Sequence, residues 1–139
     1  MSRIYDRATK LLKIRPHHSE ELRRKLLLRG FENEEVGAVI TKLQEENLIN
    51  NESFAQMYLD ELLRTKTLGF MGLKVKLLSR GIASNEADKL LKENYSFEQE
   101  RESAKKLLDK WTNLPKQKKA QRLSSRGFRS EVIREVIDR

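Results

Sequence analysis

The sequence contains no cysteine among its 139 residues. Disulfide bonds, thiol catalysis and cysteine-rich zinc sites are therefore excluded. The chain also lacks any apolar run close to the roughly 18 residues that a membrane-spanning helix requires. Residues 1–7 contain no apolar signal segment. These absences predict a cytoplasmic protein that has no contact with a membrane.

Residues that form turns and strands are also scarce. The chain has only six glycines and two prolines, and aromatic residues make up 6% of it. Short connections between helices need few such residues, whereas a β-sheet protein needs turns and β-branched runs. Hydrophobic residues (37%) are too few for a thick spherical core but too many for a disordered chain. The composition predicts an all-α fold.

Catalytic and metal-binding motifs are missing as well. There is no Gly-rich phosphate loop and no Gly-x-Ser-x-Gly turn. The two histidines, His17 and His18, are adjacent and cannot hold one metal ion as an i,i+4 pair could. We expect both at the surface, in a loop or at a helix start. The sequence predicts a protein that is not an enzyme, has no cofactor and works by binding.

A Leu-x-x-Arg-Gly pattern occurs three times and ends at Gly30, Gly81 and Gly127. The glycines are 51 and 46 residues apart, a spacing typical of helical repeats. Apolar residues recur six, nine and ten positions after each glycine. These residues are Val36, Val39 and Ile40; Ala87, Leu90 and Leu91; and Ile133, Val136 and Ile137. The coincidence of so many positions indicates an internal repeat.

Each repeat is predicted to contain three helices, with boundaries at residues 1–50, 51–96 and 97–139. The second helix ends at the glycine, which can adopt the left-handed conformation that closes a helix. The third helix begins at a polar cap, for which the candidates are Asn33, Ser84 and Ser130. Residues 96–99 have the spacing of a capping box, and residues 50–51 are expected to open the first helix of repeat two. Because one repeat cannot bury its apolar face alone, stacking predicts an elongated, curved solenoid.

The formal net charge is +8, which favours an anionic partner. Basic residues recur five positions and one position before each repeat glycine, so the two share one helix face. We call the predicted binding residues the basic ladder: Lys25, Arg29, Lys74, Lys76, Arg80, Lys118, Lys119, Arg122 and Arg126. Helix C-termini favour Lys and Arg in any case, which is an alternative explanation for the residues next to the glycines.

Trp111 and the phenylalanines are expected in the core rather than stacked on bases.

The order of these motifs resembles the RecX family of regulators of bacterial recombination, over about residues 4–137. In repeat one the resemblance is carried by Arg15, Glu21, Leu22, Arg23, Arg24 and Leu26. In repeat two it is carried by residues 48–51 with Phe54 and Ala55, then by Lys66, Gly69, Leu73, Leu77, Arg80, Gly81 and Ile82. In repeat three it is carried by Lys119, Gln121, Arg122, Arg126 and Gly127. The chain departs from the family pattern at His18, Asn51 and Thr67.

The resemblance implies a partner rather than a reaction. Members of this family bind the RecA recombinase as its filament on single-stranded DNA, lie in the filament groove and typically suppress ATPase and strand-exchange activity. It implies contact with RecA and with single-stranded DNA, directly or through RecA, by a protein that we expect to be a monomer. Two alternatives stay open: a sequence-nonspecific nucleic-acid-binding module that acts without RecA, and a helical adaptor for an acidic protein. Acidic residues in residues 33–46 and 84–94 argue against insertion of those helices into a DNA groove.

Overall fold

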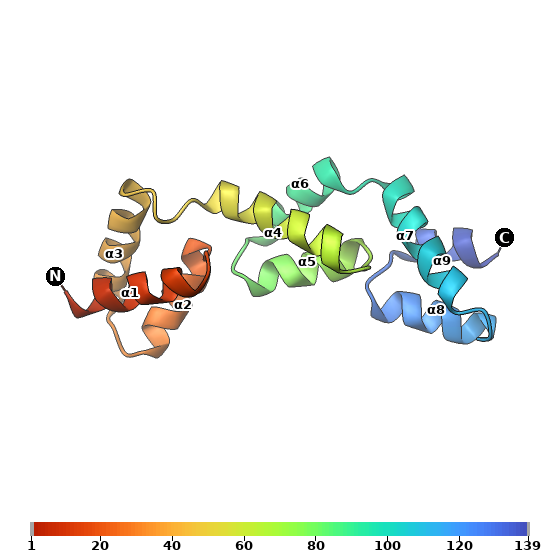
Figure 1. Cartoon of the computed structure of the whole chain (residues 1–139), viewed down its shortest axis with the longest axis horizontal. Coiled ribbons are helices and arrows are strands. Elements are labelled where there is room, and N and C mark those ends of the chain that lie inside the picture. Colours follow the sequence, from red (N-terminus) through yellow and green to blue (C-terminus); the bar gives the residue numbers. More distant parts are fainter. Residues whose placement is uncertain (1, 139) are drawn as a thin grey trace. The chain divides into compact units, whose positions relative to one another are not determined.

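The computed structural model describes residues 2–138, which contain nine α-helices and no strand (Figure 1). The all-α prediction is confirmed, as are three tandem groups of three helices. The helices are α1 (Arg3–Ile14), α2 (Ser19–Leu28), α3 (Asn33–Glu45), α4 (Asn51–Thr65), α5 (Phe70–Ser79), α6 (Ser84–Asn94), α7 (Phe97–Lys110), α8 (Lys116–Ser125) and α9 (Ser130–Ile137).

The chain divides into two compact units, and the division falls inside α4. The first unit contains the residues up to Met57 together with Ser79–Ile82, and the second contains Tyr58–Leu78 and the residues from Ala83 onward. The compact units therefore do not coincide with three repeats, and the boundaries at residues 50 and 96 stay a prediction.

Helices α1, α2 and α3 enclose the core of the first unit. Leu22 and Leu26 of α2 are fully buried, as are Val36 and Leu43 of α3. Their spacings of four and seven residues place each pair on one side of its helix, so the apolar stripes of the two helices can face each other. Ile49, which follows α3, completes this core.

The repeat glycines close the second helix of each group. Gly30, Gly81 and Gly127 have φ angles of 92°, 95° and 83°, in the left-handed region that favours glycine. Around Gly127, its own N–H donates to the Ser124 carbonyl and the Phe128 N–H donates to the Leu123 carbonyl. The same pair of bonds surrounds Gly30, and this pattern is the Schellman motif. The prediction for these glycines is confirmed.

The turn at Gly127 also packs against the start of α5. The Gly69 N–H donates to the Arg126 carbonyl at 3.0 Å, and the Met71 N–H donates to the Gly127 carbonyl at 2.9 Å. A Cβ on Gly72 would lie 2.3 Å from the Arg126 carbonyl oxygen, so only glycine permits this approach. The turn thus satisfies N–H groups that the first turn of α5 leaves without a partner inside the helix.

The predicted helix starts are correct in position but only partly in mechanism. Ser96 and Gln99 form the capping box that the sequence predicts at the start of α7, and α4 begins at Asn51 with the Asn50 side chain accepting from the Ser53 N–H. Asn33, Ser84 and Ser130 are each the first residue of their helix rather than its cap. The capping positions belong to Glu32, Ala83 and Arg129, and none of these side chains makes a capping bond.

The expected exposure of the two histidines is wrong. His17 and His18 are 3% and 4% exposed. His18 does occupy a helix start, since its Nδ1 accepts from the Glu20 N–H at the start of α2. The two rings can be buried because each makes a polar contact within the first unit, His17 with the Arg15 carbonyl and His18 with the Glu20 N–H.

Helices α7, α8 and α9 form a second apolar core, which contains Leu107, Leu123, Phe128 and Val132. Trp111, at the end of α7, is partly buried against it, as the sequence predicts.

Within residues 2–138 no helix combines the length and apolarity that crossing a bilayer demands.

Candidate binding surface

The basic ladder lies on the second helix of each group and on the turn that follows it. Lys25 lies on α2, Lys74 and Lys76 on α5, and Lys118, Lys119 and Arg122 on α8. Arg29 and Arg126 occupy the C-caps of α2 and α8, where a positive charge stabilises the end of the helix dipole. The sequence predicts these positions, but their surroundings differ from one helix to the next.

Lys25 contacts a neighbouring side chain of its own unit. Its Nζ lies 2.8 Å from Nε2 of His17. An ammonium group only donates, so Nε2 accepts, and Nδ1–H of the same ring donates to the Arg15 carbonyl at 2.9 Å. Desolvation lowers the pKa of His17, and the positive charges of Lys25 and Arg15 add to the shift. His17 is thus a neutral acceptor that orients Lys25.

The pKa of Lys25 is also lowered, first by desolvation and then by the charges of Arg15 and Arg80, while Glu21 opposes the shift. Arg15 forms an ion pair with Glu21, with Nη2 and Oε2 2.6 Å apart. The charge of Arg80, which belongs to the same unit, thus disfavours the charged form of Lys25. The repeat predicts a pair within each helix, such as Lys25 with Arg29, and gives no sign of the interaction between Lys25 and Arg80.

Lys74 is likewise occupied within the molecule. Its Nζ lies 3.0 Å from Oδ1 of Asp88 in α6, and its side chain is 17% exposed. A partner would compete with Asp88 for this ammonium group. Lys74 is therefore less available to an external anion than an exposed lysine would be, although its sequence position gives no sign of this.

The most exposed part of the ladder lies around α8. Lys118, Arg122 and Arg126 are exposed, and Lys119 is partly exposed. The guanidinium carbons of Arg122 and Arg126 lie 5.4 and 5.6 Å from the centre of the Trp111 ring. Both distances are within the range of cation–π attraction. The indole ring thus holds two arginines in place while their charges stay accessible to solvent.

A groove of about 280 Å³ joins this region to α5. We call it the α5–α8 groove. Lys76 and Arg126 both line it, so two ladder residues from different helices meet at one surface. The other lining residues are Leu68, Met71, Gly72, Val75, Ser124, Ser125 and Gly127. No carboxylate and no aromatic ring is among the described residues that line it.

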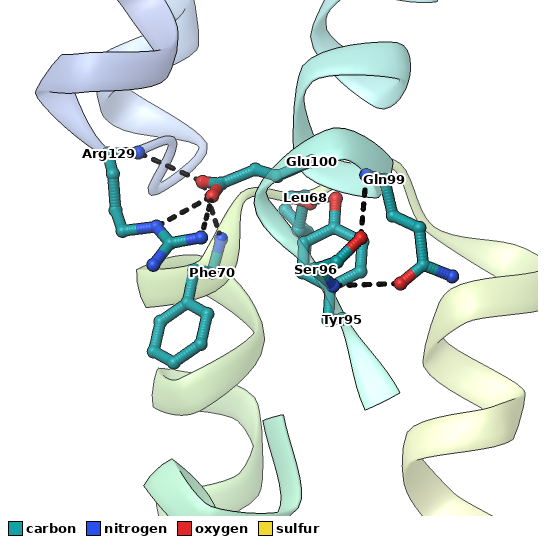
Figure 2. Close-up of polar contacts among 7 residues, drawn as sticks. All are labelled: Leu68, Phe70, Tyr95, Ser96, Gln99, Glu100 and Arg129. Carbon is teal, nitrogen blue, oxygen red and sulfur yellow. Dashed lines mark hydrogen bonds and ion pairs between the residues drawn. The ribbon is translucent and has the colours of Figure 1, made fainter. Parts of the chain in front are cut away.

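Glu100, which no sequence motif singles out, organises the backbone beneath this region (Figure 2). It is fully buried on α7. Its Oε2 accepts from the Phe70 N–H and from the Arg129 N–H, each at 3.0 Å, and its Oε1 pairs with the Arg129 guanidinium at 2.6 Å. One carboxylate thus caps the starts of α5 and α9. A lone glutamate in a charged helix gives no local signal of this role.

Neighbouring contacts hold the same region in place. The Arg129 guanidinium lies 4.3 Å from the centre of the Phe70 ring. The Tyr95 hydroxyl donates to the Leu68 carbonyl at 2.9 Å, immediately before α5 (Figure 2). Desolvation raises the pKa of Tyr95, so its hydroxyl stays protonated and able to donate. The start of α5, which forms one wall of the groove, is therefore fixed from several directions.

No metal-binding arrangement accompanies this surface. In the part of the chain that the structure describes, no three His, Asp or Glu side chains are grouped to hold an ion. The arrangement can attract anions through α8 and can contact apolar groups through α5.

The chain is similar to known RecX proteins in sequence and in fold. A family model described as "RecX, first three-helix domain" matches residues 5–43. The regulatory protein RecX of Chlorobaculum tepidum is 33% identical over 139 residues, covering 98% of this chain and 87% of the relative. A crystal structure of RecX from Lactobacillus salivarius has a TM-score of 0.80 at 24% identity, covering 98% of this chain and 93% of that one, which shows the fold alone. A crystal structure of regulatory protein RecX has a TM-score of 0.79 at 26% identity, covering 99% and 71%.

Proposed function

Because this chain belongs to the RecX family of regulatory proteins, we propose that it binds the RecA filament on single-stranded DNA and inhibits the filament's ATPase and strand-exchange activities. It would act in the cytoplasm, as a monomer, by binding rather than by catalysis. The observation that carries this proposal is the exposed cationic cluster on α8, in which Trp111 holds Arg122 and Arg126. An anionic assembly is the partner that such a cluster attracts.

The test is RecA's ATP hydrolysis on single-stranded DNA while this protein is titrated in. We expect inhibition at ratios well below one molecule per RecA, because one regulator bound to a filament can affect many subunits. The same titration in a strand-exchange assay is expected to give parallel inhibition. No effect at equimolar protein with a cognate RecA would contradict the proposal.

The second candidate is a nucleic-acid-binding module that acts without RecA, and the same α8 cluster favours it. Binding to phosphates releases counterions, so affinity for bare DNA would then fall steeply with salt. A titration of bare single-stranded DNA at several salt concentrations separates the two. Tight, salt-sensitive binding to bare DNA without any effect on RecA would favour this candidate.

A further inference from the structure

Helix α5 exposes two apolar side chains one turn apart. Met71 is 46% exposed and Val75 is 62% exposed. Residues four positions apart lie on the same face of a helix, so the two form a continuous apolar strip. Scattered exposed apolar residues are ordinary, but an apolar strip beside a groove is typical of a contact surface.

The repeat itself shows that the fold does not require this strip. Met71 and Val75 stand ten and six positions before Gly81. The corresponding residues are Glu20 and Arg24 in the first repeat and Gln117 and Gln121 in the third. All four are polar, and their helices still form and end in the same glycine turn. The apolar pair is therefore a property of α5 alone, and stability of the repeat does not explain it.

The strip forms one side of the α5–α8 groove, whose rim is cationic. Met71, Val75 and Leu68 supply apolar surface, while Lys76 and Arg126 supply positive charge. Arg126 is positioned by Trp111 and by a 3.5 Å contact between its Nη1 and the Thr67 carbonyl. The groove therefore suits a ligand that combines an apolar group with a nearby carboxylate.

These properties favour a protein segment over a nucleic acid. Phosphates would match the two cations but would leave Met71 and Val75 exposed to water. Unpaired bases could cover apolar surface, but they stack on aromatic rings, and the described lining of the groove contains none. An apolar, acidic protein segment would cover the strip and pair with the rim at the same time.

We propose that the α5–α8 groove binds an apolar, acidic segment on the protein component of the target filament, and not its DNA. This inference rests on the proposed function, because it assigns one contact within the same complex. Lys118, Lys119 and Arg122 do not line the groove and stay available for phosphates. Helix α8 and its C-cap would thus contact two components of one assembly.

The test uses the full-length double variant Met71→Gln/Val75→Gln. Glutamine is the residue that α8 carries at both corresponding positions, and both side chains are exposed, so the helix should form normally. The matched control is Leu28→Ser, which removes a side chain that is 88% exposed. Serine is what the other repeats carry there, at Ser79 and Ser125. Circular dichroism verifies that all three proteins have the same helix content.

Affinity is measured by anisotropy of labelled protein on RecA filaments and, in parallel, on bare single-stranded DNA. Loss of two apolar contacts should weaken filament binding by about tenfold or more. Binding of the double variant to bare DNA should match that of the wild type, and Leu28→Ser should match the wild type in both assays. That combination would support the assignment of the groove to a protein segment.

Other outcomes overturn the inference in distinguishable ways. If the double variant binds filaments as tightly as the wild type, the groove is not a contact, and the proposed function stands. If it loses affinity for bare DNA to the same degree, the groove holds nucleic acid. If the wild type sediments as a dimer that the double variant dissociates, a second copy occupies the groove. If the wild type does not bind filaments at all, the proposed function fails and this inference fails with it.

Discussion

At the scale of single residues, the buried polar side chains make contacts that hold separate parts of the chain together. Glu100 joins the starts of α5 and α9, and His17 orients Lys25. A buried polar group that loses its hydrogen bonds costs about 1–3 kcal/mol. Both positions therefore allow predictions in which a small chemical change has a measurable effect on stability.

Replacing Glu100 by glutamine should strongly destabilise the protein. The amide keeps the shape of the side chain but removes the charge that pairs with the Arg129 guanidinium and two helix starts. Breaking a buried ion pair in this way should lower the free energy of unfolding by about 3 kcal/mol. Urea denaturation measures the change. Glu98→Gln is the control, since Glu98 lies on the same helix and its pair with Arg101 is exposed, so about 0.5 kcal/mol or less is expected.

Stability should fall as the pH drops below the ordinary histidine pKa of 6.5, because the pKa of His17 is lowered in the folded protein. The unfolded chain then binds the proton more readily than the folded one, so acid favours unfolding. Protonation would set the ring against Lys25 and Arg15, and Glu21 only partly offsets this. Urea denaturation between pH 7.5 and 5.5 measures the slope. His17→Gln should have a shallower slope, and an equal slope would exclude His17 as its source.

At the scale of elements, the glycine turns connect one group of helices to the next within each unit. The turn at Gly127 packs on the start of α5 through two backbone bonds. At Gly81, an added Cβ would lie 2.7 Å from the Glu21 nitrogen at the start of α2. The C-terminal turn of α8 thus meets the start of α5, and the C-terminal turn of α5 meets the start of α2. These close approaches depend on the absence of side chains at a few positions.

Gly72→Ala should destabilise the protein even though alanine is the better helix former. Its Cβ would lie 2.3 Å from the Arg126 carbonyl oxygen, so the turn must move. Forcing extra volume into packed structure typically costs about 1–3 kcal/mol. Gly37→Ala, inside α3 with open space around the added Cβ, should instead stabilise by about 0.5–1 kcal/mol. Thermal unfolding of both variants is the measurement, and equal changes would contradict the packing argument.

The elements that depend on local signals could be predicted from the sequence. The three glycine turns follow from one short motif, and the capping box of α7 follows from the spacing of Ser96 and Gln99. The polar caps proposed for the third helices were wrong by one residue, since Glu32, Ala83 and Arg129 occupy the capping positions and none of their own side chains makes a capping bond. Local sequence patterns predict that a helix exists more reliably than they predict which hydrogen bonds form at its ends.

The surroundings of the candidate site could not be predicted in the same way. Glu100 bonds to Phe70 and Arg129, which lie 30 and 29 positions away, so no nearby pattern signals the contact. The sequence places Lys25 and Lys74 on the second helices of their repeats, but it does not reveal that His17 and Asp88 contact them. The basic ladder as a binding surface stays a prediction.

At the scale of the whole molecule, the net charge of +8 sets the long-range attraction while the ladder sets where an anion binds. These two contributions can be separated. A variant that changes net charge away from the ladder alters only the first, whereas one that changes the ladder alters both. The distinction requires two variants of equal total charge.

Reversing four ladder charges, in Lys76→Glu/Arg80→Glu/Arg122→Glu/Arg126→Glu, should weaken filament binding by at least about tenfold, because cations at the contact become like charges. Circular dichroism should show unchanged helicity. The control reverses four exposed cations of α1, namely Arg3, Arg7, Lys10 and Lys13. Both variants are formally neutral, so a titration at moderate salt compares position rather than charge. Equal affinity of the two variants would remove the ladder from the binding surface.

Trp111 is the only tryptophan of the chain, and it lies beneath Arg122 and Arg126. The protein therefore carries an intrinsic fluorophore at the centre of its cationic cluster. A partner that draws either guanidinium away from the indole ring changes the environment of that ring, and its emission should change with occupancy. Association could then be followed in real time with the unlabelled protein, and silence of this signal during binding would place the contact elsewhere.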